Sequence, residues 1–132
     1  MSVDSIADFL TIIRNGVMVS KSFVTAPYSK MRYSIAQILK DEGFIVDCVV
    51  LNADSDVEKA LKVVLKYVDG ESAIHEIQRV SKPGRRVYTG NKELKPVIGQ
   101  LGISIITTSR GVIASQTAKK LSVGGEVLCT VW

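Results

Sequence analysis

The sequence predicts an α+β fold of two small, closely packed lobes, an N-terminal α/β lobe and a mostly β C-terminal lobe with a short helix. The two clearest amphipathic helices lie early in the chain, whereas most later apolar runs are short, β-branched and separated by glycine, proline or aspartate turns. The length of 132 residues suits one compact domain and excludes a large multidomain enzyme. We expect the lobes to comprise residues 1–70 and 71–132.

The first lobe is expected to contain two helices and three strands. Pro27 ends the first β-branched run because proline cannot donate to a sheet, Ser29 supplies a cap for the second helix, and Gly43 follows its end. The expected elements are a helix over 4–18 capped by Ser2 or Asp4, a strand over 22–27, a helix between Ser29 and Gly43, and strands over 44–51 and 58–68. Residues 58–68 also have lysines at helical spacing, but their valine-rich composition favours a strand.

The second lobe is expected to be mostly β. Its clearest strand runs from Ile103 to Thr108, an apolar run that ends in hydroxyl side chains. Asp69-Gly70 and Pro83-Gly84 are typical of turns, and Ser115 is expected to cap a short helix. The other expected elements are strands over 74–80, 86–89, 111–113 and 127–131, a short helix that begins at Pro96 and ends near 99–102, and the end of the Ser115 helix at Leu121.

The cysteine content and the hydropathy argue against disulfides, metals and membranes. Cys48 and Cys129 lie far apart in apolar runs, without a CxxC pair or a His/Cys cluster, so we expect two buried thiols in a reducing cytoplasm. No apolar run approaches the roughly 18 residues of a membrane-spanning helix, and no signal peptide begins the chain. The expectation is a cytoplasmic protein with no metal, no cofactor and no membrane partner.

No catalytic constellation can be assembled from this sequence. His75 is the only histidine, and its place in a strand-like segment favours a structural role. The stretch from Gly84 to Lys92 resembles a phosphate-binding loop only superficially, because Glu93 stands where a hydroxyl should hold magnesium. We therefore expect neither an enzyme nor a small-molecule substrate.

Charge is distributed unevenly along the chain. Residues 1–40 carry five basic and two acidic residues, residues 41–77 carry three and nine, and residues 78–132 carry nine and two, although the net charge is only +4. Such asymmetry is typical of an interaction surface and favours a polyanion as the partner of the basic C-terminal segment. The alternative is that both segments are solvated faces of unlike sign.

Polar residues and glycines near the C-terminus supply binding chemistry. Thr107, Thr108 and Ser109 place three hydroxyls at a strand end, where they suit phosphate oxygens, 2′-hydroxyls and base edges because a hydroxyl both donates and accepts. A serine–threonine turn without a ligand remains an alternative for this motif. A second predicted turn, in which glycines leave the backbone accessible, consists of Gly124, Gly125 and Glu126. The lobe also contains a basic cluster with one aromatic ring: Arg85, Arg86, Tyr88 and Lys92.

Six blocks in order along the whole chain are more specific than any single motif. They are Ile6-Ala7-Asp8 with Ile13-Arg14-Asn15, Pro27 with Ser29-Lys30, Glu42-Gly43-Phe44-Ile45, Arg79 to Gly84, Gly102 to Lys119, and Gly124 to Cys129. Together they resemble the small-subunit ribosomal protein S8 family. Two departures concern local helix caps: Ser5 follows Asp4 where the family commonly has proline, and Ala114-Ser115 stand where it often has an acid.

The resemblance implies an RNA-binding scaffold of the small ribosomal subunit. Its rRNA partner would be an irregular helix in the central domain of the small-subunit rRNA, and its protein partners would be neighbouring ribosomal proteins. Some bacterial members also bind a similar structure in their own operon mRNA and repress it. The residues implied to bind RNA are Thr107, Thr108, Ser109, Arg110, Gly111, Gly124, Gly125, Glu126, Arg86, Tyr88 and Lys30.

An alternative of a different class stays open on the residues alone. In that interpretation the acidic segment 41–77 is the functional face of a protein-binding adaptor. It predicts that removing the charges of Asp54, Asp56 and Glu58 destroys function while the hydroxyl cluster tolerates change. A small enzyme is the weakest option.

Overall fold

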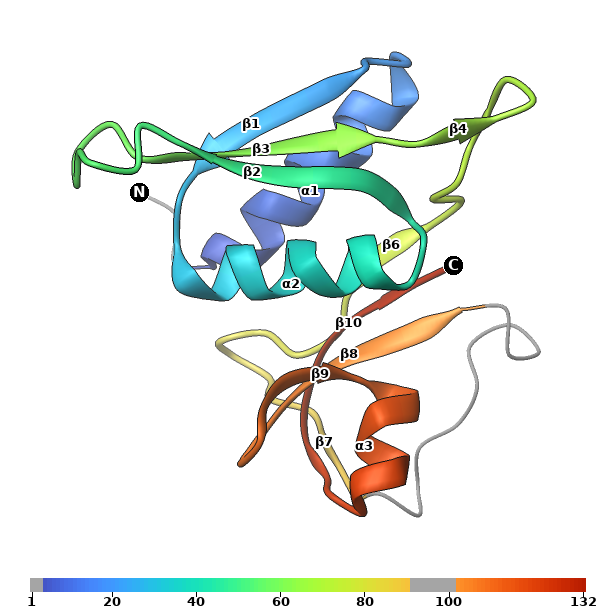
Figure 1. The fold of residues 1–132 in the computed structure, drawn as a ribbon. Helices are drawn as coiled ribbons and strands as arrows, with labels where there is room; N and C mark the ends of the chain where they lie inside the picture. Colours follow the sequence, from blue (N-terminus) through green and yellow to red (C-terminus); the bar gives the residue numbers. More distant parts are fainter. Residues whose placement is uncertain (1–3, 91–101) are drawn as a thin grey trace. The chain divides into compact units, whose positions relative to one another are not determined.

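The computed structural model describes residues 4–90 and 102–132 (Figure 1). The described residues form helices and antiparallel strands in several sheets, which is the α+β fold that the sequence predicts. The chain divides into two compact units. One consists of Ala7–Ile74, and the other contains His75–Trp132 together with the residues that precede Ala7.

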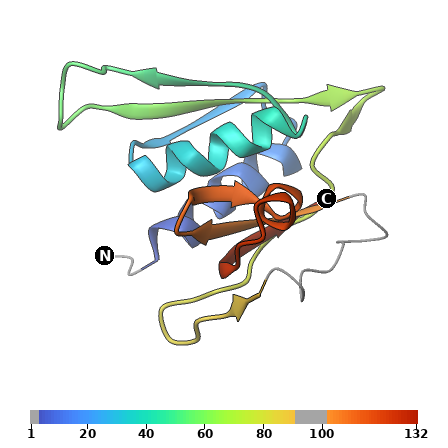
Figure 2. The same cartoon turned by 60° about the horizontal axis from the view of Figure 1, so that its bottom comes forward.

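The Ala7–Ile74 unit is an antiparallel sheet with its helices on one face (Figure 2). The strand order is β1-β3-β2, with bounds Phe23–Pro27, Ala60–Leu65 and Ile45–Leu51, and the helices are α1 (Ser5–Met18) and α2 (Lys30–Asp41). Val24, Val63 and Cys48 lie opposite one another on the three strands and are all buried. Gly16 allows α1 to approach β1 closely, because a Cβ there would lie 2.4 Å from Val24 Cγ1. A small hairpin, β4 (Tyr67–Val68) and β5 (Glu71–Ser72), follows the sheet.

Local signals in this unit act as the sequence predicts. The Ser29 side chain accepts a hydrogen bond from Arg32 N at 3.1 Å and caps α2. Helix α2 ends at Asp41, and Gly43 follows with a φ of 82°, a conformation that favours glycine. The ambiguous segment 58–68 forms β3 rather than a helix, because its alternating side chains bury Leu61, Val63 and Leu65 on one face of the sheet.

The His75–Trp132 unit contains a larger antiparallel sheet and one helix. The strand order is β6-β10-β8-β9, with bounds Ile77–Arg79, Gly125–Val131, Ile103–Thr108 and Gly111–Ala114; β7 (Tyr88–Thr89) also pairs with β10. Helix α3 (Ser115–Leu121) follows β9 directly. Its Ala118 is fully buried against Ile106 of β8, and Ile113 and Val123 complete this small cluster.

Some predicted details of this unit are wrong. Ser115 does not cap α3: it is the first helical residue, and its hydroxyl accepts a hydrogen bond from Ser104 N of β8 at 3.2 Å. The reason is that β9 runs straight into the helix, so Ala114 occupies the capping position. The strand expected over 74–80 is limited to Ile77–Arg79, and the segment 86–89 pairs only at Tyr88–Thr89. Ser2 and the helix expected at Pro96 lie outside the described residues.

Both cysteines are buried free thiols, as predicted. Burial raises the pKa of Cys129 to about 12, so this thiol is protonated and unreactive at neutral pH. His75 is exposed, and its ring centroid lies 5.3 Å from that of Trp132. No helix in the described part of the chain is both long and apolar enough to cross a membrane. Residues 4–90 and 102–132 contain no group of three or more side chains that could hold a metal ion.

Candidate functional site

The predicted hydroxyl cluster forms the turn between β8 and β9. Ser109 and Arg110 are exposed at its tip, and Gly111 has a φ of 102°, which an L side chain rarely adopts. The Thr108 hydroxyl accepts a hydrogen bond from Arg110 N and donates one to Gly111 O, both at 3.0 Å. Thr108 therefore shapes the turn, while the neighbouring residues Ser109 and Arg110 are exposed to solvent.

Gly125 and Glu126 do not form the turn that the sequence predicts: they begin strand β10, which pairs with β8 beside this hairpin. Glu126 pairs with Thr107 of β8 on one side and with Tyr88 of β7 on the other. Side chains that are directly opposite in an antiparallel sheet point to the same face, so Tyr88, Glu126 and Thr107 form one row across three strands. Gly125 lies so close to β8 that a Cβ would be 2.0 Å from Thr107 O. The lack of a side chain at Gly125 is what lets the two strands approach.

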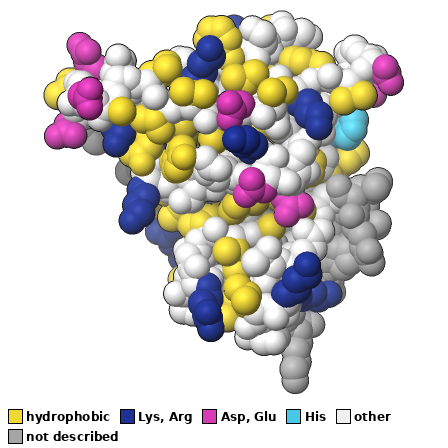
Figure 3. All heavy atoms as spheres, in the orientation of Figure 1, with side chains coloured by type: hydrophobic (Ala, Val, Ile, Leu, Met, Phe, Trp, Pro, Cys, Tyr) yellow, Lys and Arg dark blue, Asp and Glu magenta, His cyan; other side chains and the backbone are white. Residues whose placement is uncertain are grey.

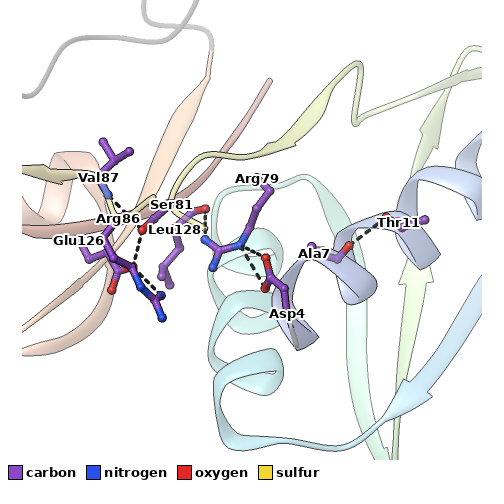
Figure 4. Close-up of polar contacts among 9 residues, drawn as sticks. All are labelled: Asp4, Ala7, Thr11, Arg79, Ser81, Arg86, Val87, Glu126 and Leu128. Carbon is purple, nitrogen blue, oxygen red and sulfur yellow. Dashed lines mark hydrogen bonds and ion pairs between the residues drawn. The ribbon is translucent and has the colours of Figure 1, made fainter. Parts of the chain in front are cut away.

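The Glu126 carboxylate is held by a polar network (Figure 4). The fully buried Ser81 hydroxyl donates to Glu126 Oε2 and accepts from Val87 N at 3.1 Å. Arg86 Nη1 donates to the same carboxylate oxygen at 3.0 Å. The Ser81 hydrogen bond, followed by the Arg86 contact, lowers the pKa of Glu126 below its ordinary value despite the opposing effect of burial. Glu126 is therefore an anion at neutral pH, and it fixes the direction of the half-exposed Arg86 side chain.

In the same unit, the largely buried side chain of Arg79 makes a second contact with β10. Arg79 Nη1 donates to Leu128 O at 2.6 Å, and Arg79 Nε forms an ion pair with Asp4 at 3.1 Å (Figure 4). Both side chains are largely buried, so the pair ties the start of the chain to β6 and β10. Sequence reasoning did not identify Arg79 and Ser81 as parts of the site. The available signal was their place in the Arg79 to Gly84 block, just before a Pro-Gly turn.

The other predicted residues supply charge and an aromatic ring. Tyr88 is 68% exposed, and Arg86 makes only one of its possible hydrogen bonds among the described residues. Gly124 directly precedes β10. The same unit contains four further exposed basic residues: Lys82, Arg85, Lys119 and Lys120. Figure 3 shows Lys and Arg side chains on this unit on both sides of a small hydrophobic patch. Lys30 belongs to the Ala7–Ile74 unit, where it is the exposed first residue of α2.

This arrangement suits a polyanion with hydroxyl groups. It combines exposed guanidinium and ammonium groups for phosphates, hydroxyls that can both donate and accept, and bare backbone where a ligand can approach closely. Among residues 4–90 and 102–132 there is no cluster of His, Cys, Asp or Glu side chains that could hold a metal ion.

Comparison with known proteins identifies similar chains. The family model described as "Ribosomal protein S8" matches residues 4–132. The "Small ribosomal subunit protein uS8" of Marinobacter nauticus is 49% identical over 129 residues, which cover 98% of this chain and 97% of the relative. The proteins of the same name from Rhodopirellula baltica and from Bradyrhizobium sp. strain BTAi1 are 49% and 50% identical, and each alignment covers at least 97% of both chains.

Proposed function

This chain belongs to the ribosomal protein S8 family and is a structural component of the small ribosomal subunit, not an enzyme, and we propose that it binds ribosomal RNA with the β8–β9 turn and the adjoining strands β7 and β10. The RNA partner that we propose is an irregular helix in the central domain of the small-subunit rRNA. Neighbouring small-subunit proteins are its other partners, and the protein works in the cytoplasm within the ribosome.

The observation that carries this proposal is the row of Tyr88, Glu126 and Thr107 beside the exposed hydroxyl turn. The row joins an aromatic ring, a carboxylate that orients Arg86, and the first of three consecutive hydroxyls. Double-stranded RNA exposes 2′-hydroxyls and base edges in a wide, shallow minor groove, which short polar side chains and bare backbone can follow. A pure phosphate-binding surface would not need this combination.

The predicted residues have different proposed roles. Thr107, Thr108 and Ser109 contact the minor groove of the RNA. Gly111, Gly124 and Gly125 let the RNA approach the protein backbone closely. Glu126 orients Arg86 in addition to any contact of its own. The groups that meet phosphates or stack on bases are Arg86, Arg110 and Tyr88, with Lys30 as a further contact from the Ala7–Ile74 unit.

We further propose that the same surface binds a structure of similar shape in the operon mRNA that encodes this protein. Because both RNAs would bind the same surface, they should compete for the protein. Unlabelled rRNA fragment should displace a labelled operon fragment, and variants of the turn should weaken both complexes together.

The test is a salt titration of the binding of this protein to a central-domain rRNA fragment and to an unrelated duplex of equal length. We expect a preference of at least about 10³-fold for the fragment at physiological salt, with a linear decline of log affinity against log salt. Arg86→Ala should lower affinity for every RNA and make the slope shallower by about 0.7 to 0.9. Lys66→Ala, in the other unit, is the matched control. Equal, weak binding to both RNAs would refute the proposal and favour the adaptor alternative.

A further inference from the structure

Strand β1 is an outer strand of its sheet with an open backbone edge. Ser22 O accepts from Leu65 N, and Tyr28 N donates to Lys59 O, so the backbone groups of alternate residues, from Ser22 to Tyr28, face β3. Alternation in an antiparallel pair then directs the N–H and C=O groups of Phe23 and Thr25 to the other side. Among the described residues β1 pairs with no strand on that side.

The open edge has defined ends. Pro27 has no N–H, and its carbonyl accepts from Arg32 Nη1 at 2.8 Å. At the other end, Lys21 N donates to Gly16 O at 2.9 Å and Lys21 O accepts from Tyr67 Oη at 2.7 Å. The four backbone groups of Phe23 and Thr25 remain between these ends. They match an extended segment of about three to five residues.

Two adjoining hollows flank this edge. One, of about 380 Å³, is lined on its helix side by Ile12, Gly16 and Val19, and the other, of about 420 Å³, follows Ser22 and Phe23; both include Lys21, Val24 and Thr25. Val19 and Phe23, which line the hollows, are apolar side chains that are 67% and 45% exposed, and Met18, the neighbour of Val19 in the chain, is 75% exposed. Hydrophobic side chains reach the surface at this upper end of the unit in Figure 3. A free strand edge beside exposed apolar groups is a template for another strand.

The chemistry of the lining selects the kind of partner. Within residues 4–90 and 102–132, Lys21 is the only charged residue that lines either hollow. One cation is too few for a polyanion such as RNA, which depends on several phosphate contacts. A second copy of this chain would oppose identical strands, and the lining of the same edge supplies no carboxylate to pair with Lys21. An extended apolar segment with one carboxylate can form hydrogen bonds with the backbone groups of Phe23 and Thr25. It can also place apolar side chains in the hollows and pair its carboxylate with Lys21.

We propose that the open edge of β1 binds an extended segment of a neighbouring small-subunit protein, which adds as a fourth strand of the β1-β3-β2 sheet. The segment places an apolar side chain against Val19 and Val24 and a carboxylate near Lys21. This interface rests on the place of the chain in the small subunit, but it uses a different unit and different residues from the proposed RNA site.

The test is site-specific photocrosslinking in assembled small subunits. Phe23 is replaced by p-benzoylphenylalanine, the protein is assembled into subunits with rRNA and the other small-subunit proteins, and the adducts are analysed after irradiation. We expect one predominant adduct with another ribosomal protein, joined within an extended apolar segment that carries an acid. An adduct with RNA alone, an adduct with a second copy of this chain, or no adduct would each overturn the proposal.

Surface variants locate the interface. Val19→Asp, and separately Met18→Asp, should reduce the adduct from position 23 at least fivefold, because both place a charge beside the hollow without burying it. Val49→Asp is the matched control on β2, the opposite outer strand, and should leave the adduct unchanged. Circular dichroism verifies the fold of each variant, and equal loss in Val49→Asp would overturn the assignment. Binding of the free variants to the central-domain fragment should not change, which separates this test from that of the RNA site.

Discussion

Two neighbouring residues of β10 contribute to the site in opposite ways. Gly125 acts through the absence of a side chain, because a Cβ would collide with the backbone of Thr107. Glu126 acts through a charge that accepts a hydrogen bond from Ser81 and pairs with the Arg86 guanidinium. The glycine sets the distance between β10 and β8, and the carboxylate sets the direction of a guanidinium on their surface. Their effects on substitution should therefore differ in kind.

Gly125→Ala should destabilise the His75–Trp132 unit by about 1 to 3 kcal/mol, the usual cost of forcing an extra methyl group into a packed position. The colliding atom is a backbone oxygen at 2.0 Å from the new Cβ, so the strands must separate. Denaturation followed by the fluorescence of Trp132, the only tryptophan, measures the change. Gly84→Ala is the control, because nothing lies within 4 Å of its Cβ and no positive φ is required. Equal stability of the two variants would contradict the close-approach argument.

Glu126→Gln should destabilise the protein by about 1 kcal/mol at neutral pH and have little effect in acid. The folded protein lowers the pKa of Glu126 below its ordinary 4.5, so the stabilisation is complete above that value and is lost as the pH falls through the folded pKa. The measurement is the unfolding free energy of both proteins at pH 7 and at about pH 3. Glu71→Gln, at an exposed acid of the other unit, should have an effect within about 0.5 kcal/mol at both pH values. A difference as large in acid as at pH 7 would show that the charge is not responsible.

At the scale of elements, the β8–β9 turn is built by its own threonine. Thr108→Val removes both hydrogen bonds of the hydroxyl, to Arg110 N and to Gly111 O, and should weaken specific RNA binding by about 1 to 3 kcal/mol. Thr108→Ser keeps the hydroxyl and should retain most of the affinity. Ser109→Ala tests a hydroxyl that faces solvent and should also lose affinity. Unchanged binding in Thr108→Val and Ser109→Ala, with the fold verified by circular dichroism, would remove the turn from the RNA site.

Elements whose partners are local could be predicted from the sequence, and those with distant partners could not. The sequence predicts Ser29 as the cap of α2, and its partner, Arg32 N, is only three residues away. The predicted capping role of Ser115 is wrong, and its actual partner, Ser104 N, lies on a strand eleven residues earlier in the chain. The carboxylate network joins Glu126 to Ser81 and Arg86, which are 45 and 40 residues away. The structure brings the predicted residues Thr107, Glu126 and Tyr88 together, whereas the contact between Glu126 and Arg86 becomes visible only in the folded chain.

At the scale of the whole molecule, acidic and basic residues are concentrated in different parts of the chain. The acidic residues between β2 and β3 gather at the tip of that hairpin, where Figure 3 shows acidic side chains at one end of the Ala7–Ile74 unit. The basic residues after position 78 belong to the other unit, which carries the proposed RNA site. The modest net charge of +4 therefore hides one surface suited to a polyanion and one that repels it.

Neutralising the hairpin tip distinguishes the RNA-binding interpretation from the adaptor alternative. The combined variant Asp54→Asn, Asp56→Asn and Glu58→Gln should keep the affinity for the central-domain fragment or raise it slightly, because the change removes only long-range repulsion that salt screens beyond about 10 Å. All three residues are exposed and none forms an ion pair with another described residue, so the fold should be unaffected. Binding titrations at two salt concentrations, with Arg86→Ala alongside, measure both effects. Loss of subunit incorporation in the neutral variant, together with full incorporation of Thr108→Val, would make the acidic segment the functional face and refute the assignment of the RNA site.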